Sequence, residues 1–231
     1  MTFTALHNRS RARHRARSWP LALGAVAGAA ALVLVFYLLW PTWSGTSAEM
    51  ADRFPITVGG TLFDVPRDAI RVGVQRRSGD QERVDLAFQY PSLTSPAPQA
   101  PVTAETAEQT PVAIDRIFVT LAAHNGEMAP AERVRTIYPR YLDPFQQDNI
   151  DGLTRAGFRD GSPYHHEDMF GDAGGKFLAR CTRDAVTPGT CSSERRVGGA
   201  DITFRFPRTW LKDWRDIASA IEQLNAKLVK N

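Results

Sequence analysis

The sequence predicts an α+β fold: a mainly antiparallel β-sheet covered on one face by a C-terminal amphipathic helix, with one N-terminal transmembrane helix. Three observations predict it. An uninterrupted apolar run lies near the N-terminus, several strand-length segments alternate apolar and polar residues around glycine-containing turns, and the last twenty or so residues repeat apolar side chains at helical spacing. Alternating strands leave one apolar face, and an amphipathic helix can cover it.

The apolar run, residues 21–40, has no charged side chain and no Asn, Gln, Ser or Thr. At about 1.5 Å per residue it is roughly 30 Å long as a helix, which matches the hydrocarbon core of a bilayer. Five arginines and no acidic residue precede it, so the positive-inside rule leaves the N-terminus in the cytoplasm. We therefore predict a basic cytoplasmic tail at residues 1–19 and a transmembrane helix at residues 20–40.

A cleaved signal peptide is the alternative for this region. Its apolar part usually spans about 7 to 15 residues, which is shorter than the run observed. The small residues that follow, at 45–48, also lack an A-x-A cleavage site. Length therefore favours an uncleaved signal-anchor.

The net positive charge of the chain comes from its N-terminal tail and not from the rest of the sequence. The formal net charge is +3, but the five tail arginines leave 23 basic and 25 acidic residues in the remainder, a balance of −2. Nucleic-acid binding needs basic residues on the folded domain, so we expect no nucleic-acid partner. The lipid bilayer is the partner expected for the tail and the helix.

The exported part is predicted to begin with a polar spacer at residues 41–53, followed by one globular domain at residues 54–231. Gly59 and Gly60 separate two short apolar runs, which predicts a hairpin over residues 54–65. Period-two alternation at residues 70–74 and 84–90, around a turn at residues 78–80, predicts a second hairpin with one buried face.

The middle of the domain is less regular. Four prolines among small and polar residues predict a mobile loop at residues 94–111, and β-branched and aromatic residues at 114–122 predict a central strand. Residues 132–143 are expected to form a short helix. The Gly and Asp content of residues 146–175 predicts loops.

Regular structure returns in the last third. Strands at residues 176–182, 192–197 and 201–206 predict a three-stranded meander. The final helix carries a seam of apolar side chains: Trp210, Trp214, Ile217, Ile221, Leu224 and Leu228. A coiled coil is the alternative, but two tryptophans on the seam favour a helix that packs on a sheet.

The two cysteines, Cys181 and Cys191, both lie in the exported part, where an oxidising compartment predicts a disulfide. A turn at Pro188 and Gly189 lies between the strands that carry them. The two side chains can therefore meet across the mouth of a hairpin. A zinc knuckle is the rival, but nine intervening residues do not match its spacing.

Adjacent histidines supply the best metal candidate: His165 and His166 precede two carboxylates, with His124 as a distant third ligand. Neighbouring residues of an extended segment point to opposite sides, so both imidazoles rarely reach one ion. The preferred interpretation is a solvated polar loop, with no metal and no cofactor. No G-x-S-x-G motif is present, and catalytic residues are not identified, although acid/base pairs that meet only in space remain open.

Small residues four apart, Gly24 and Gly28, lie in the predicted transmembrane helix. Such a motif allows two spanning helices to approach closely, which makes a homodimer through this face one expectation. Frequent Gly and Ala in spanning helices are the alternative explanation.

Three segments, GGTLFDVPRDAIR at 59–71, RVDLAFQYPSL at 83–93 and FRFPRTWLKDW at 204–214, resemble parts of functionally uncharacterised single-pass bacterial envelope proteins. The resemblance implies location in the bacterial inner membrane, with the N-terminus in the cytoplasm and the C-terminal domain in the periplasm. It supplies no catalytic residues.

The preferred hypothesis is a membrane-anchored, non-enzymatic extracytoplasmic protein that scaffolds or binds a partner in an envelope complex. A membrane-tethered metal-dependent hydrolase is one alternative, and it requires the three histidines to converge with carboxylates in a cleft. An extracytoplasmic ligand-binding or sensor domain is the other, and it requires an apolar pocket.

Overall fold

The computed structural model describes residues 19–39, 52–97 and 114–230, and the chain forms two compact units, Met1–Glu49 and Met50–Asn231. The predicted basic tail, nearly all of the spacer at 41–53 and most of the loop at 94–111 lie outside the described residues. Each unit is described by itself below.

Helix α1, Trp19–Leu39, is the described element of the first unit. Its side chains are described only at Gly24 and from Val26 to Val35, and all of these are exposed. Over the described residues as a whole, no helix is both long and apolar enough to cross a bilayer. The transmembrane assignment therefore stays a prediction.

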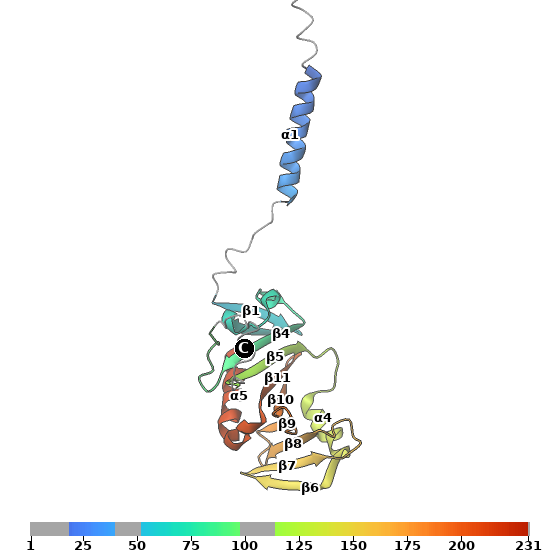
Figure 1. Cartoon of the computed structure of the whole chain (residues 1–231), viewed down its shortest axis with the longest axis vertical. Coiled ribbons are helices and arrows are strands. Elements are labelled where there is room, and N and C mark those ends of the chain that lie inside the picture. Colours follow the sequence, from blue (N-terminus) through green and yellow to red (C-terminus); the bar gives the residue numbers. More distant parts are fainter. Residues whose placement is uncertain (1–18, 40–51, 98–113, 231) are drawn as a thin grey trace, which may run out of the picture. The chain divides into compact units, whose positions relative to one another are not determined.

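The second unit combines a three-stranded sheet, ordered β2-β1-β3, with an eight-stranded antiparallel sheet, ordered β4-β5-β11-β10-β9-β8-β7-β6. Figure 1 shows the eight strands following one another in this order. The strands are β1 Arg53–Val58, β2 Thr61–Pro66, β3 Gly79–Asp80, β4 Arg83–Gln89, β5 Arg116–Ala123, β6 Leu142–Ile150, β7 Leu153–Phe158, β8 Glu167–Asp172, β9 Leu178–Thr182, β10 Thr190–Val197 and β11 Ala200–Pro207. The helices are α4 Pro130–Thr136 and α5 Trp214–Leu228.

The main core joins one face of the large sheet to α5 and to the inner side of the small sheet. Side chains alternate along β11, so Ile202, Phe204 and Phe206 face this core and are fully buried. Helix α5 presents Ile217, Ala220, Ile221, Leu224 and Leu228 to it. The predicted α+β fold, with a mainly antiparallel sheet covered by a C-terminal helix, is confirmed.

The small sheet is joined to the large one where two turns touch. A Cβ atom on Gly199 would lie 1.7 Å from the carbonyl oxygen of Gly59, so only glycine permits this backbone contact. The Thr61 hydroxyl secures it by accepting the Gly199 N–H at 2.9 Å and donating to the Val197 carbonyl at 3.2 Å. The predicted hairpin through Gly59 and Gly60 is confirmed as β1 and β2.

A second, smaller core occupies the opposite face of the large sheet. Tyr138, in the 3₁₀ turn Tyr138–Arg140 after α4, packs with Ala156, Phe158 and Met169 of β7 and β8. Because this core and the α5 core lie on opposite faces, the large sheet is covered on both sides, and β7 and β8 contribute residues to both cores.

Two predicted segments are wrong. Residues 70–74 do not form a strand, because Gly73–Gln75 is a 3₁₀ turn and pairing with β4 is limited to a bridge from Ile70 to Leu86. Val74 remains 79 % exposed, so these residues lack the buried face that would hold a strand against the core.

Residues 146–175, expected to be loops, contain most of β6 and all of β7 and β8. Strand β6 is almost entirely exposed at the sheet edge, so it has no apolar alternation to detect. In β8 three consecutive residues, Asp168, Met169 and Phe170, are buried, so this strand has no apolar alternation, and the aspartate interrupts its apolar run.

Candidate functional site

The candidate site is a groove that opens where β9 and β10 separate. Their antiparallel register contains two pairs, Cys191 with Cys181 and Ser192 with Arg180. Strand β10 continues for five more residues and stays paired with β11 to its end, at Val197 with Ala200. Strand β9 likewise pairs with β8 along its whole length. The large sheet is therefore continuous at one end of β10 and split at the other.

The alternation of hydrogen bonds between β10 and β11 shows which main-chain groups of β10 point toward the gap between β9 and β10. Arg208 N–H donates to the Gly189 carbonyl at 2.8 Å, and bonded pairs recur every second residue along an antiparallel ladder. Odd-numbered residues of β10 therefore bond to β11, and the N–H and C=O groups of Ser192, Glu194 and Arg196 point the other way. Ser192 meets Arg180, whereas no described pairing joins Glu194 or Arg196 to β9.

The edge of β9 that faces β10 also has main-chain groups directed into the gap. Arg183 N–H donates to the His166 carbonyl at 2.8 Å, which directs the main-chain groups of Cys181 and Ala179 toward β8. The groups of Leu178 consequently point toward the split. Two strand edges thus lie across the groove from each other with hydrogen-bonding groups directed into it.

The groove has a volume of about 1100 Å³, at the upper end of the range typical of ligand sites. Helix α4 and the turn after it form one wall, and α5 forms another. The apolar and small residues that line it are Ala129, Pro130, Ala131, Val134, Tyr138, Met169, Phe177, Leu178, Ala179 and Ala218. Because α4 and α5 cover opposite faces of the sheet, the groove reaches both faces through the split.

The charges along the groove are five basic and three acidic residues. Most are neutralised in pairs: Glu194 accepts from Arg133 at 2.7 Å and Arg195 lies 2.7 Å from Glu222. Arg135 and Lys176 are exposed and form no ion pair with any described residue. The groove therefore carries a positive excess.

An aromatic cluster anchors the α4 wall. The Arg180 guanidinium lies 5.4 Å from the Tyr138 ring centroid and 5.2 Å from that of Tyr164, and its Nε is 2.9 Å from Glu167 Oε2. Burial raises the pKa of the Tyr138 phenol above its ordinary value, which outweighs the opposing effect of Arg180. Tyr138 thus remains a neutral phenol, and its ring packs edge-to-face against Phe158 and Tyr164.

A turn stabilised by Asp172 shapes the β8 side of the groove. Its carboxylate accepts the N–H groups of Phe177 at 2.7 Å and Gly174 at 3.0 Å. The Phe177 N–H, followed by other backbone donors, lowers the pKa of this carboxyl below its ordinary value of 3.8, despite an opposing effect of burial. The turn leads into β9 at the point where that strand leaves β10.

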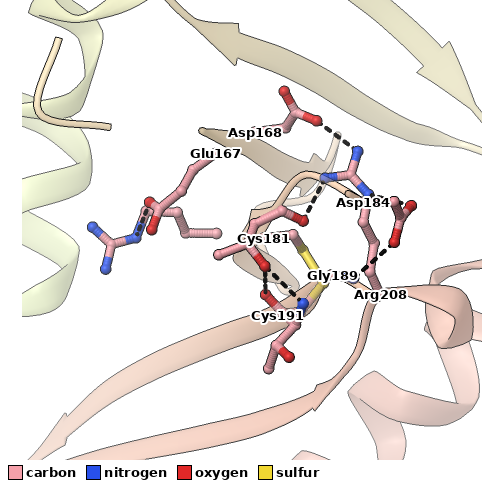
Figure 2. The surroundings of a disulfide bond; sticks show 10 residues. Glu167, Asp168, Cys181, Asp184, Gly189, Cys191 and Arg208 are labelled. Atoms are coloured by element: carbon pink, nitrogen blue, oxygen red, sulfur yellow. Dashed lines mark hydrogen bonds and ion pairs between the residues drawn. A yellow bond between two sulfur atoms is a disulfide. The ribbon is translucent and has the colours of Figure 1, made fainter. Parts of the chain in front are cut away.

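A disulfide joins Cys181 and Cys191, as predicted, at the strand pair next to the point where β9 and β10 separate (Figure 2). Beside it, Asp168 is 3 % exposed and accepts from Arg183 at 2.9 Å and from Arg208 at 2.5 Å. Arg208 also donates to the Thr182 carbonyl at 3.0 Å. Both carboxylate oxygens of Asp168 have a guanidinium partner, so this cluster holds three strands together and leaves no group free for catalysis.

His165 and His166 contact each other, although adjacent side chains were expected to point apart, but His124 does not join them. His165 and His166 lie in the loop before β8 with ring centroids 3.8 Å apart, and His165 Nδ1 is 2.9 Å from the Ser162 carbonyl. His124 follows β5, where its N–H donates to Gly199, and β11, β10 and β9 separate that strand from β8. Within residues 19–39, 52–97 and 114–230, no group of three or more His, Cys, Asp or Glu side chains is arranged to hold a metal.

The two glycines of the proposed helix-packing motif, Gly24 and Gly28, lie in α1. A Cβ atom at either position would meet nothing within 4 Å. The space beside both is therefore open in the single chain, and the homodimer stays a prediction.

Sequence reasoning identified the disulfide but missed the groove. The residues that face it, Glu194, Arg196 and Leu178, were assigned to ordinary strands. One signal was present: residues 194–196 are consecutive charged residues on both faces of a strand, which is unusual inside a fully covered sheet.

No protein-family model and no curated protein matches the chain. Two solved structures are similar to it in fold. The first is Smlt3025, an immunity protein of the Stenotrophomonas maltophilia type IV secretion system, with 13 % identity and a TM-score of 0.47 over 78 % of this chain and 94 % of that chain. The second is FrpD, an iron-regulated outer membrane lipoprotein of Neisseria meningitidis, with 8 % identity and a TM-score of 0.39 over 80 % of this chain and 95 % of that chain. Neither likeness carries a functional assignment.

Proposed function

We propose that the protein is a non-enzymatic binding component of the bacterial envelope, which holds a partner protein in the groove between α4 and α5. One observation carries the proposal: a groove of about 1100 Å³ enters a split between two neighbouring strands and presents apolar side chains together with main-chain groups. In the empty groove water can bond to the main-chain groups that no strand pairs, and an extended segment of a partner can replace that water.

The lining of the groove supports binding. Small and apolar residues form most of its walls, and most of its charged side chains are held in ion pairs. Beside the groove, both oxygens of the buried Asp168 carboxylate are bonded to arginines.

The proposal includes a tether in the inner membrane, with the C-terminal unit in the periplasm. The apolar run at 21–40, the five preceding arginines and the helical backbone of α1 support it. The disulfide fits an oxidising compartment. A second copy bound through Gly24 and Gly28 is compatible with this arrangement and is proposed only as an accessory contact.

Site-specific photo-crosslinking in membranes tests the binding role. A photoreactive residue in place of Ala131, on the α4 wall, should form a discrete adduct with one partner, and the adduct should disappear when Ser219→Trp fills the groove from α5. The same probe at Ala226, which is exposed on α5 outside the groove, is the matched control. Equal adducts at both positions, or none at Ala131, would refute the groove as a binding site.

A further inference from the structure

We infer that the occupant of the groove is an extended acidic segment of a partner protein, which adds as a β-strand to the free edge of β10. The inference rests on the proposed function and specifies its ligand. Strand addition to an exposed edge is a common mode of peptide recognition, in which main-chain bonds supply affinity and side-chain pockets supply specificity.

The first support is the periodicity of the available main-chain groups. Glu194 and Arg196 direct their N–H and C=O groups into the groove, two residues apart, as an added strand requires. Leu178 offers the same groups from the opposite side. An incoming strand can therefore bond to β10 on one edge, and its other edge faces β9.

The second support is the way in which β10 is held. Its other edge is paired with β11 over eight residues, and its Glu194 and Arg195 side chains form ion pairs with α4 and α5, respectively. Because these contacts fix β10 without using its inner edge, the template is rigid before a ligand arrives. A preorganised edge reduces the ordering cost of binding.

The third support is the side-chain environment on either face of the split. One face offers Val134, Tyr138 and Leu178, and the other offers Phe177 and Ala218. Successive residues of an added strand would point alternately into these two faces. The gap between β9 and β10 therefore accepts apolar side chains on both faces of the added strand.

The positive charge of the groove indicates that the bound segment is acidic. Arg135 lies at the α4 wall and Lys176 in the turn that precedes β9, and both are exposed without an ion-pair partner among the described residues. Acidic side chains near the ends of the segment would pair with them. Such contacts mainly increase the association rate and select against basic segments.

The inference can be tested on the full chain in detergent micelles. Binding peptides are selected from a displayed library of random peptides about eight residues long, the length of β10. Ser219→Trp protein serves as counter-selection, and Ala226→Trp as the control that should bind normally. Enriched peptides should carry apolar residues at consecutive positions in their middle, with Asp or Glu near an end. Arg135→Glu with Lys176→Glu should weaken them about tenfold or more, whereas Arg140→Glu, exposed outside the groove, should not.

N-methylation of the selected peptide decides between strand addition and other modes. N-methyl groups at the alternate positions that face β10 should each reduce affinity about tenfold, because each removes a hydrogen bond to Glu194 or Arg196. Of the intervening positions, only one that faces Leu178 should also be sensitive. Hydrogen exchange at the Glu194 and Arg196 amides should slow on binding. An aperiodic N-methyl profile would overturn the inference while leaving the proposed function intact, provided that the Ala131 adduct forms.

Two other occupants would also overturn it. If the full chain is a dimer that Ser219→Trp dissociates, the groove holds a second copy. If peptides bind only after residues 98–113 are deleted, the groove holds the chain's own segment.

Discussion

Cys181 and Cys191 lie opposite each other in β9 and β10, one residue before these strands part. The disulfide therefore links the two strands beside the point at which they separate. Their position explains why a covalent link is needed here: after the Ser192 and Arg180 pair, no further described backbone pairing holds the two strands together.

Removing the disulfide should destabilise the domain and loosen the groove. For Cys181→Ser with Cys191→Ser we expect a loss of roughly 2 to 3 kcal/mol in the free energy of unfolding, because a loop of about eleven residues is no longer closed in the unfolded chain. Hydrogen exchange at Arg180 and Ser192 should accelerate, since this terminal pair of the ladder is no longer held by the covalent link beside it. Two free thiols in protein isolated from the periplasm would contradict the structural role.

The C-terminal helix should depend more on Leu224 than on Trp214. Leu224 is fully buried, so Leu224→Ala is expected to cost about 2 to 5 kcal/mol. Trp214, predicted as a core residue, is only partly buried: its ring packs on Phe177 at 5.6 Å and its Nε1 donates to the Asp151 carbonyl. Trp214→Ala should cost about 1 to 3 kcal/mol.

Urea unfolding of both variants, with Gln223→Ala as an exposed control on the same helix, measures the difference. A change in oligomer size without a change in stability would instead support the coiled-coil alternative.

Asp172 should make stability depend on acid pH. Its pKa is lowered in the folded protein, so its stabilising contribution is complete above the ordinary value of 3.8 and is lost as the pH falls through the lower folded value. Asp172→Asn should therefore melt below the wild type at neutral pH, and the difference should shrink in acid. Asp160→Asn, an exposed site, should show no such convergence. A difference that is constant across the acid range would contradict the assignment.

An uncleaved transmembrane helix at residues 20–40 would place the two ends of the chain on opposite sides of the membrane. A reporter that is active only outside the cytoplasm should be active when it is fused after residue 231, and inactive when it is fused before residue 19. The mature protein should retain its N-terminal methionine or the residue that follows it. Mass spectrometry of a mature chain that starts near Glu49 would show cleavage and refute the anchor.

The sequence by itself determined the elements whose signal is local. The spacing of Ile217, Ile221, Leu224 and Leu228 predicted the buried face of α5, because a helix brings residues three and four apart to one side. Gly59 and Gly60 predicted the first hairpin for the same reason, since a tight turn is defined by adjacent residues.

Only the tertiary structure decided the features that depend on distant partners. Strand β8 was hidden because its buried Asp168 is tolerated only beside Arg183 and Arg208, 15 and 40 residues away in the sequence. The groove was hidden because strand pairing is a relation between segments. The residues of β9 and β10 specify two strands, but whether those strands stay together is decided by α4, α5 and the ion pairs that hold β10 from both sides.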